Sequence, residues 1–384
     1  MRNWLLPEYI EDVLPAKAMQ IESLRRSLLD LLDVNGYQLV IPPMLEYLES
    51  LITGVAHDLD LATFKVVDQL TGRLMGIRAD ITPQAARIDA HMLNNHGVTR
   101  LCYAGSVLRT TPDGLAHTRQ PMQLGAELFG HSGIEADIEI QRLMVKTLQA
   151  AGVEALQIDF SHVGIFDSLI SQAKGSESLK QSIYQALQSK DQTEIIALTK
   201  DFDASNCKAL CRLTELNGDA DVLDAAAKDL PKTPEITKAL NDLKQVASEL
   251  ADLGVGLSFD LAELRGYHYH SGIVFAAYAQ GCSGPLAYGG RYDEVGRAFG
   301  RSRAATGFSL DLRGLIKAIP PRTVKKGILA PYGKEVSLLN KINSLRASGE
   351  KVVQELPGHE AYKQELNCDR KLVHQAGQWQ VIAL

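Results

Sequence analysis

The side chains best suited to chemistry lie in an apolar segment, residues 121–129. Alternation along this segment, taken as a strand, places Gln123, Gly125 and Glu127 on one face and apolar side chains on the other. A carboxylate in such an apolar strand needs a partner or a ligand, whereas a strand with a solvated second face would simply expose Glu127. Gly125 is expected to leave the space between its two polar neighbours open.

Two further segments carry polar rows that would complete a pocket. Alternation places Arg78, Asp80 and Thr82 on one face of the first. The second, a predicted strand at 100–109, ends in Arg109 and leads into a loop rich in Pro, Gly and Thr. A strand, a mobile loop and a strand suit closure over a small anionic or zwitterionic ligand. These neighbours favour a binding role for Glu127 over simple exposure.

A third segment, residues 263–272, is rich in aromatic and basic side chains. Arg265 offers a fork for a carboxylate, and Tyr269 and His270 offer pocket walls. His268 and His270 could also be metal ligands on one strand face. We rank that reading second, because no third ligand lies at a recognisable spacing.

The glycine-rich segments contain no P-loop, no Rossmann fingerprint and no GxSxG elbow. Residues 288–293 form a predicted turn with an accessible backbone floor. A Gly-Gly pair of this kind is weak support for phosphate binding, because it is also ordinary turn chemistry.

Composition places the 384-residue chain among globular proteins, with 45% hydrophobic and 22% charged residues. Its net charge of -6 gives no global attraction to nucleic acid. Five cysteines without CxxC spacing fit neither a disulfide framework nor a zinc site, so we expect reduced, buried fillers. No apolar run reaches membrane-spanning length and the N-terminus lacks a secretory pattern, which favours a cytoplasmic protein with no membrane contact.

Periodicity predicts the elements that must position these side chains. Helical stripes predict helices at 16–34, 134–150 and 234–253. Alternation and β-rich composition predict strands at 100–109, 121–129, 156–160, 256–261 and 267–279. Pro42-Pro43 prevents the apolar segment before it from continuing as a central strand.

The pattern divides the chain into parts. Residues 164–253 are predicted to be a helical insertion in a mixed α/β domain formed by 1–163 and 254–320. Pro320-Pro321-Arg322 resembles a linker, so 321–384 is expected to form a short α/β C-terminal domain. Its predicted elements are strand 327–330, helix 334–347, strand 350–354 and a weaker remainder.

In this order the segments resemble the catalytic domain of class II histidyl-tRNA synthetases, over roughly residues 7–319. The matches are Gly36 to Pro43 with Glu46 for the dimer-forming motif 1, Arg109 and 123–130 for motif 2, 264–270 for the histidine signature, 288–293 for the glycine-rich loop and 307–315 for motif 3. The resemblance implies an α/β (α+β) fold of the class II aminoacyl-tRNA synthetase type, with an antiparallel sheet flanked by helices.

Departures from the ligase pattern point away from its activity. Thr111 stands where motif 2 of the ligase has an acidic residue, and Arg313-Gly314 stands where motif 3 ends in Glu-Arg. That arginine holds the nucleotide phosphates, so its loss removes a main means of gripping a triphosphate. Arg313, one position earlier, is expected to point elsewhere.

Two further departures concern the amino-acid pocket and the tail. The two tyrosines of the histidine signature become Tyr269 and His270. The 63 residues from 322 to 384 are too few for an anticodon-binding domain of about 100 residues. The tail therefore resembles a truncated remnant of that domain.

A chain of this kind resembles the regulatory-subunit family of ATP phosphoribosyltransferase. The family's ligase-like chain has no catalysis of its own. It assembles with a short-form catalytic subunit that condenses ATP with phosphoribosyl pyrophosphate, the first step of histidine biosynthesis, and it takes part in feedback inhibition by histidine. The resemblance implies a hetero-oligomer, expected to be a hetero-octamer, and a self-dimer through motif 1. L-histidine is the expected effector, and no tRNA, cofactor or metal is expected.

The resemblance also implies roles for the polar residues. No residue is expected to be catalytic. The expected histidine-binding set is Asp80 and Gln123 for the ammonium, Arg265 for the carboxylate, and Glu127 with Tyr269 or His270 for the imidazole, completed by Thr82 and Arg109.

Two other functions remain open. A divergent histidine-tRNA ligase is disfavoured by Thr111, Gly314, the short tail and the acidic balance. A free-standing amino-acid sensor would share the pocket but not the assembly.

Overall fold

The computed structural model describes residues 4–52, 57–112, 118–171, 176–267, 269–320 and 325–384. The chain forms two compact units, Met1–Pro320 and Pro321–Leu384. His268, part of the loop that follows Arg109, and part of the expected linker lie outside the described residues.

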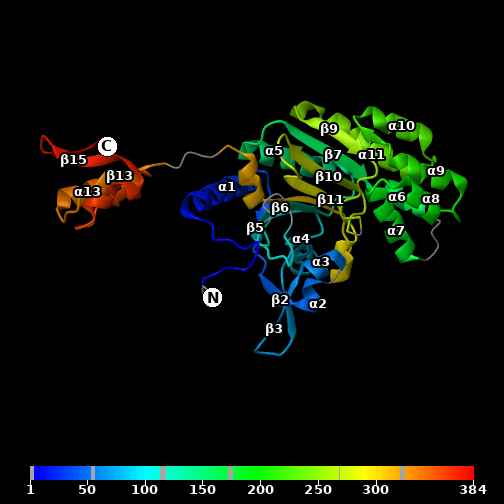
Figure 1. The fold of residues 1–384 in the computed structure, drawn as a ribbon, viewed down its shortest axis with the longest axis horizontal. Coiled ribbons are helices and arrows are strands. Elements are labelled where there is room, and N and C mark those ends of the chain that lie inside the picture. The colour runs from blue at the N-terminus through cyan, green and yellow to red at the C-terminus, as the bar shows by residue number, and fades with distance from the viewer. Residues whose placement is uncertain (1–3, 53–56, 113–117, 172–175, 268, 321–324) are drawn as a thin grey trace. The chain divides into compact units, whose positions relative to one another are not determined.

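A mixed nine-stranded sheet is the centre of the larger unit, in the order β1-β5-β6-β12-β11-β10-β7-β9-β8 (Figure 1). In that order the strands are Gln38–Leu39, Thr99–Ser106, Met122–Phe129, Ala305–Asp311, Ala287–Arg291, Ile273–Ala279, Leu156–His162, Gly256–Asp260 and Asn217–Gly218. The six strands from β5 to β7 pair antiparallel, whereas β1 pairs with β5, and β9 with β7, in parallel. The antiparallel core confirms the expected fold class.

Three helices that contact one another and the sheet bury its apolar side chains: α1 (Pro15–Val34), α5 (Ile134–Ala151) and α12 (Leu312–Ala318). The α1 stripe of Ile21, Leu24, Leu28 and Leu32 is buried. Gly36 follows the end of α1 with φ of +86°, a left-handed backbone conformation that favours glycine. The predicted ends of α1 and α5 are confirmed to within one residue.

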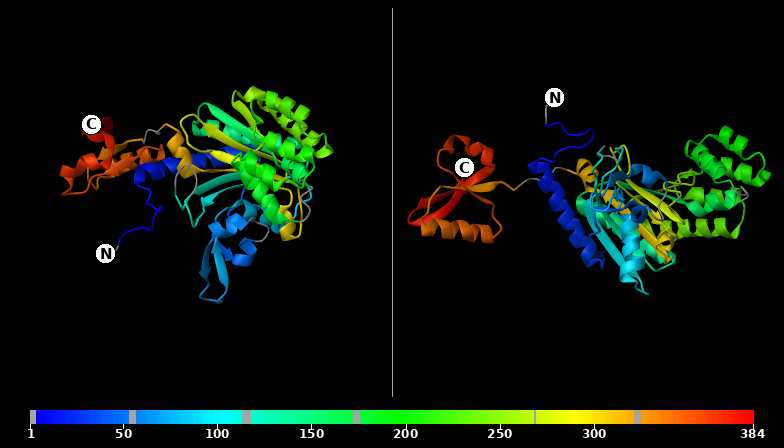
Figure 2. Two further views of the ribbon diagram at one scale, coloured as in Figure 1. Left: turned by 45° about the vertical axis from the view of Figure 1, so that its right-hand side comes forward. Right: turned by 90° about the horizontal axis from the view of Figure 1, so that it is seen from below.

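Further helices lie between β7 and β9. They are α6 (Val163–Ile170), α7 (Glu177–Gln188), α8 (Gln192–Leu198), α9 (Ala204–Leu213), α10 (Asp221–Asp229) and α11 (Pro234–Leu250), followed by a 3-10 turn, Ala251–Leu253. Figure 1 and both views of Figure 2 show most of these green helices grouped at one side of the unit. The start of α11 follows the predicted pattern, because Thr233 Oγ1 accepts from the Ile236 N–H at 3.2 Å and Pro234 occupies the first turn. This region also contributes the edge strand β8, which the helical pattern did not predict.

A three-stranded sheet, in the order β2 (Leu45–Tyr47), β4 (Leu74–Ile77) and β3 (Phe64–Val67), lies near the short helices α2 (Leu48–Leu51), α3 (His57–Ala62) and α4 (Thr82–Arg87). A π-helical turn, Ile88–Leu93, follows α4. The predicted strand face shared by Arg78, Asp80 and Thr82 is wrong, because β4 ends at Ile77 and Pro83 starts a helix. Arg78 instead donates to the carbonyls of Ser106 and Pro42 at 3.0 and 2.7 Å. It thereby holds the motif 1 segment in place.

The second unit contains a four-stranded sheet with its own small core. Its strands, in the order β14-β13-β15-β16, are Val352–Gln354, Gly327–Ala330, Cys368–Gln375 and Gln378–Ala383, accompanied by α13 (Val336–Ala347) and a 3-10 segment, Glu360–Leu366. The remainder that sequence left undefined forms the antiparallel hairpin β15/β16.

Other expectations need correction. Residues 269–271 precede β10 rather than belonging to it, and Tyr288 to Arg291 lie within the central strand β11, not in a turn. All five cysteines are free as expected, but Cys102 alone is fully buried. No helix of the described residues is long and apolar enough to cross a membrane.

Candidate functional site

A cavity of 650 Å³, called the central cavity below, opens against strands β6, β11 and β12. Its walls also include the turn before α4 and the signature loop, which we define as residues 263–267 and 269–271. The predicted binding residues that line it are Asp80, Thr82, Arg109, Glu127, Arg265, Tyr269 and His270. Gln123 does not line it, but hydrogen bonds to Asp80 and lines a smaller neighbouring pocket with Arg109. The structure therefore brings the predicted set together.

Glu127 lies buried at the base of the cavity. Its Oε1 accepts from the Tyr103 hydroxyl at 2.9 Å and its Oε2 accepts from the Tyr292 hydroxyl at 2.5 Å. Burial raises the pKa of Glu127 to about 8, although both tyrosine hydroxyls oppose that rise. At neutral pH the carboxyl therefore holds a proton in most molecules.

Glycines shape the space around this carboxyl, but not as predicted. A Cβ at Gly125 would overlap the Tyr103 hydroxyl, so Tyr103 fills the space expected to be open. The room for Glu127 comes from Gly307, its register partner on β12, where a Cβ would overlap Glu127 Oε2. Tyr103 could have been found by pairing the two predicted strands, since it lies directly opposite Gly125.

A chain of hydrogen bonds fixes the Asp80 carboxylate. Its Oδ1 accepts from Gln123 Nε2 at 2.7 Å and from the Thr82 N–H at 2.9 Å. Gln123 Oε1 accepts from the Ile81 N–H at 2.9 Å, which ties the turn to β6. Thr82 Oγ1 lies 2.8 Å from the Tyr103 hydroxyl. Asp80 is thus held as an oriented anion beside the Glu127 site.

The signature loop supplies one cation and two ring walls. Arg265 is exposed, and its Nε lies 3.7 Å from Glu263 Oε1, a long contact that leaves the guanidinium near the cavity mouth. The ring of Tyr269 packs on Tyr292 with centroids 5.1 Å apart, yet its buried hydroxyl has no hydrogen-bond partner within the described residues. Burial lowers the pKa of His270 to about 4, so this imidazole is neutral. An unpartnered buried hydroxyl beside a cavity is a group that a polar ligand can satisfy.

Arg109 lies where the central cavity meets its smaller neighbour. Its Nε donates to the Ala79 carbonyl at 3.2 Å, and its backbone N–H donates to the Arg119 carbonyl at 2.8 Å. The guanidinium is therefore oriented by backbone groups. Thr111 contributes to the same wall without charge.

Arg313 does not replace the missing phosphate-gripping arginine. It is 5% exposed, its Nη2 lies 3.0 Å from Glu11 Oε1, and its Nη1 donates to the Gln120 carbonyl at 3.1 Å. Gly314 lines the smaller pocket at the corresponding place. The expectation that Arg313 points elsewhere is confirmed.

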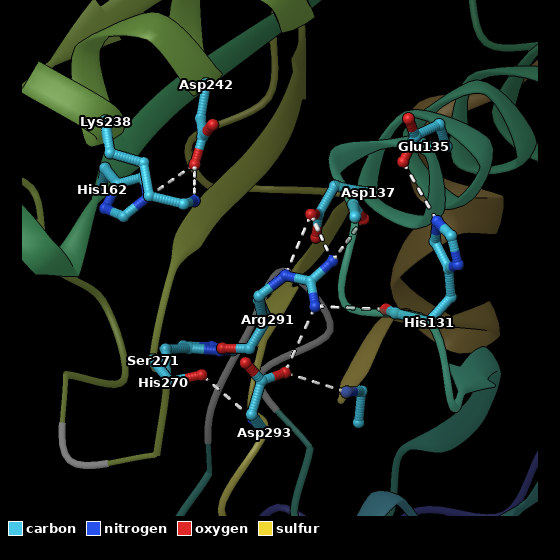
Figure 3. A network of polar contacts seen from close by, with 12 residues as sticks. His131, Glu135, Asp137, His162, Lys238, Asp242, His270, Ser271, Arg291 and Asp293 are labelled. Atoms are coloured by element: carbon cyan, nitrogen blue, oxygen red, sulfur yellow. Dashed lines mark hydrogen bonds and ion pairs between the residues drawn. The ribbon is translucent and has the colours of Figure 1, made fainter. Parts of the chain in front are cut away.

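Behind the cavity a buried ion pair ties β11 to α5 (Figure 3). Arg291 Nε and Nη2 donate to Asp137 Oδ2 at 3.0 and 2.6 Å, and Nη2 also donates to the Gly133 carbonyl at 3.0 Å. The Arg291 carbonyl accepts from the Ser271 N–H at 2.7 Å, so the same residue anchors the end of the signature loop. Sequence reasoning missed this support because its partners are far apart in the chain.

No group of three or more His, Cys, Asp or Glu within the described ranges could hold a metal ion. His270 lies in the loop rather than on a strand face, and His268, the other histidine of that alternative, lies outside the described residues.

Comparison with known proteins extends these observations. The family model for histidyl-tRNA synthetase matches residues 9–315, and that for the ATP phosphoribosyltransferase subunit HisZ C-terminal domain matches 325–382. A relative from Methylobacillus flagellatus named ATP phosphoribosyltransferase regulatory subunit is 64% identical over 100% of this chain and 99% of its own. A relative of the same name from Nitrosospira multiformis is 54% identical over 99% and 98%.

Solved structures agree. One from Bacillus halodurans, described as an ATP phosphoribosyltransferase regulatory subunit/histidyl-tRNA synthetase, superposes with a TM-score of 0.84 at 26% identity, covering 97% of this chain and 98% of that one. Histidyl-tRNA synthetase from Nostoc sp. PCC 7120 gives a TM-score of 0.78 at 18% identity, covering 100% and 97%. The second likeness concerns the fold alone.

Proposed function

This chain belongs to the family of ATP phosphoribosyltransferase regulatory subunits, and we propose that it acts as the histidine-sensing, non-catalytic subunit of that enzyme. In this proposal it assembles with a short-form catalytic subunit for the first step of histidine biosynthesis. It binds L-histidine in the central cavity and transmits feedback inhibition to its partner.

One observation carries the proposal: the cavity presents separate groups for each part of histidine. Asp80 is an anion for the α-ammonium, with Gln123 holding it in place. Arg265 at the mouth is a cation for the carboxylate, with Arg109 on the same cavity wall. Glu127 at the base, with the Tyr269 hydroxyl, suits the two ring nitrogens of an imidazole.

Three features favour regulation over amino-acid activation. Arg313 is paired with Glu11, Gly314 carries no charge, and Thr111 lacks the carboxylate that the ligase has at this position. Phosphoryl and nucleotidyl chemistry depends on positioned cations around the phosphates, which these positions do not supply.

Assembly is the second part of the proposal. The motif 1 segment exposes apolar side chains, including Leu39, Ile41, Met44 and Leu45, and such exposure within one short segment favours an interface. We propose that the chain dimerises there and joins the catalytic subunit, with a hetero-octamer as the expected complex. A cytoplasmic location is also proposed, in keeping with five free cysteines.

Calorimetry tests ligand binding. Arg265→Ala and Glu127→Ala should each weaken L-histidine binding by at least about tenfold, since the first removes a charge-assisted contact and the second a buried hydrogen bond to the imidazole. Arg297→Ala is the matched control, because Arg297 is an exposed arginine that does not line the cavity. Unchanged binding in both cavity variants would overturn the assignment.

Assembly assays separate the functions. The purified catalytic subunit should gain activity with this chain and lose it when histidine is added. Reciprocity then requires phosphoribosyl pyrophosphate to change the affinity of the complex for histidine by the same factor by which histidine changes its affinity for phosphoribosyl pyrophosphate. Histidine binding without any partner binding would leave the sensor alternative, and histidine-dependent pyrophosphate exchange would restore the ligase alternative.

A further inference from the structure

Helix α7 contacts the entry to the signature loop, and none of its described residues lines the central cavity. Its buried residues are Ile183, Ala186 and Leu187, and the helix contacts α8 and α9. Tyr184 and Gln188, four residues apart, share another helix face. Both donate to backbone carbonyls at the entry to the loop, Tyr184 to Leu264 at 3.2 Å and Gln188 to Ala262 at 2.7 Å.

Tyr267 continues the same contact from the loop side. Its ring stacks on Tyr184 with centroids 5.3 Å apart and meets Phe166 of α6 edge-on at 5.0 Å. Its hydroxyl donates to Asp167 Oδ1 at 2.7 Å. Unlike its neighbours Arg265 and Tyr269, Tyr267 is not part of the cavity lining. Tyr267 therefore contacts α6 and α7, whereas Arg265, Gly266, Tyr269 and His270 line the cavity.

A short ion pair completes the contact beyond the helix end, where Lys190 Nζ lies 2.8 Å from Asp260 Oδ2. The segment 260–267 is thus held at Asp260, Ala262, Leu264 and Tyr267, by α6, α7 and Lys190 just after α7. Within its described residues the loop is closed by backbone bonds from the Tyr267 N–H to the Leu264 carbonyl at 3.0 Å and from the Tyr269 and His270 N–H groups to the Gly266 carbonyl at 2.8 and 3.1 Å. Such a loop depends on its supports for a fixed position.

We propose that α7 is the positioning element of the histidine-binding loop, with Gln188 and Tyr267 as positioning residues that set Arg265, Tyr269 and His270 toward the cavity. The inference rests on the proposed function for the identity of the ligand. It assigns to the helical insertion a role in the pocket. Because the coupling is reciprocal, bound histidine should in turn slow the opening of α7.

The test compares Gln188→Ala and Tyr267→Phe with Gln192→Ala in the full chain. Gln192 Nε2 donates to Thr214 Oγ1 at 2.8 Å, to Glu215 Oε1 at 3.0 Å and to the Cys211 carbonyl at 3.5 Å, so the control removes amide bonds within the insertion and none of these bonds reaches the loop. Tyr267→Phe keeps the stacked ring and removes the hydroxyl bond to Asp167. The unfolding temperatures are measured as well, so that variants are compared only where their loss of overall stability is the same.

The first measurement needs no ligand. Hydrogen exchange of loop peptides covering 261–271 should be faster by about tenfold in Gln188→Ala and Tyr267→Phe than in wild type, the change expected for one lost bond to a local opening. Gln192→Ala should leave these peptides unchanged. Equal loop exchange in Gln188→Ala and Gln192→Ala would overturn the inference.

The second measurement is the dissociation constant for L-histidine. The double variant Gln188→Ala/Tyr267→Phe should raise it about threefold or more, because a smaller fraction of loops is competent to bind. Unchanged affinity despite faster loop exchange would also overturn the positioning role. A wild-type chain that does not bind histidine refutes the proposed function instead, while the exchange experiment still decides whether α7 fixes the loop.

Discussion

Protonation of Glu127 predicts how histidine binding depends on pH. Burial holds the pKa of this carboxyl at about 8, so at pH 7 only about one ligand-free molecule in ten has it ionised. The ligand's imidazole has an ordinary pKa of about 6.5 and is mostly neutral at that pH. Glu127 therefore already carries the proton that it would share with the neutral imidazole in a carboxyl–imidazole hydrogen bond. Binding in this range therefore requires no proton exchange with solvent.

The affinity is expected to be highest between about pH 6.5 and 8. Below that window the imidazole is cationic while Glu127 is still protonated, so binding must release a proton and weakens as pH falls. Above it Glu127 is ionised while the imidazole is neutral, so binding must take up a proton and weakens as pH rises. At pH 5.5 and pH 9 the dissociation constant should each time exceed its plateau value by about tenfold.

Isothermal titration calorimetry of wild type and Glu127→Gln from pH 5.5 to 9.5 checks this expectation. Two buffers of different ionisation enthalpy count the protons exchanged. The amide occupies the space of the protonated carboxyl but cannot titrate, so Glu127→Gln should lose the upper edge and bind about tenfold more weakly at pH 7. The ligand's α-ammonium titrates in both experiments, which makes the variant its own control. An edge near pH 8 that survives unchanged in Glu127→Gln, or a wild-type affinity that stays flat from pH 8 to pH 9, refutes the reasoning.

Other expectations follow from the same contacts. Tyr292→Phe removes a hydrogen bond that lowers the pKa of Glu127, so the upper edge of the binding profile should move to higher pH in the same titration. Glu127→Gln should stabilise the ligand-free chain. The wild-type carboxyl has a folded pKa of about 8 against an ordinary 4.5. Its contribution to the free energy of unfolding is therefore fully present below pH 4.5 and falls by about 1.4 kcal/mol per pH unit as the pH rises to 8. Urea unfolding at pH 5 and pH 8 should show the difference between the two proteins widening, and a constant difference would contradict it. Asp137→Asn removes the closer of the two carboxylates paired with the buried Arg291 guanidinium, leaving Asp293 Oδ1 at 3.3 Å, and should cost about 1.5–3 kcal/mol in urea unfolding; a loss below 1 kcal/mol would argue that the pair is solvated. Gly314→Arg should show no histidine-dependent pyrophosphate exchange, because the remaining nucleotide contacts are also absent, and measurable exchange in that variant would point to a residual ligase.

Elements with a clear local signal could be predicted from sequence. The periodic stripe, Thr233 cap and Pro234 of α11 act within a few residues of one another, and its start was predicted correctly. Errors arose where tertiary contacts decide. Alternation from Arg78 to Thr82 resembled a strand, but Pro83 starts a helix there. Hairpin β15/β16 had too weak a pattern to predict, since its stability comes from packing within the small second unit.

The candidate site was predictable in its residues and not in its geometry. Polar side chains in apolar surroundings, such as Glu127, can be recognised from sequence because burial without a partner is costly. Which residues satisfy them depends on strand pairing, so Tyr103 and Tyr292 were missed. Support from α7 was equally hidden, because Gln188 and Ala262 are 74 residues apart.

The pairing of Glu127 with Gly307 has a consequence for how this cavity can change. The two residues are register partners, so the depth of the cavity at this point is set by the backbone ladder and not by a rotamer. A slip of one residue would place Thr306 or Phe308 opposite the carboxyl and turn alternate side chains to the other face. Point substitutions can therefore retune the rim around Arg265 in small steps. The floor changes only where Glu127 itself is replaced or the strand pair is rebuilt.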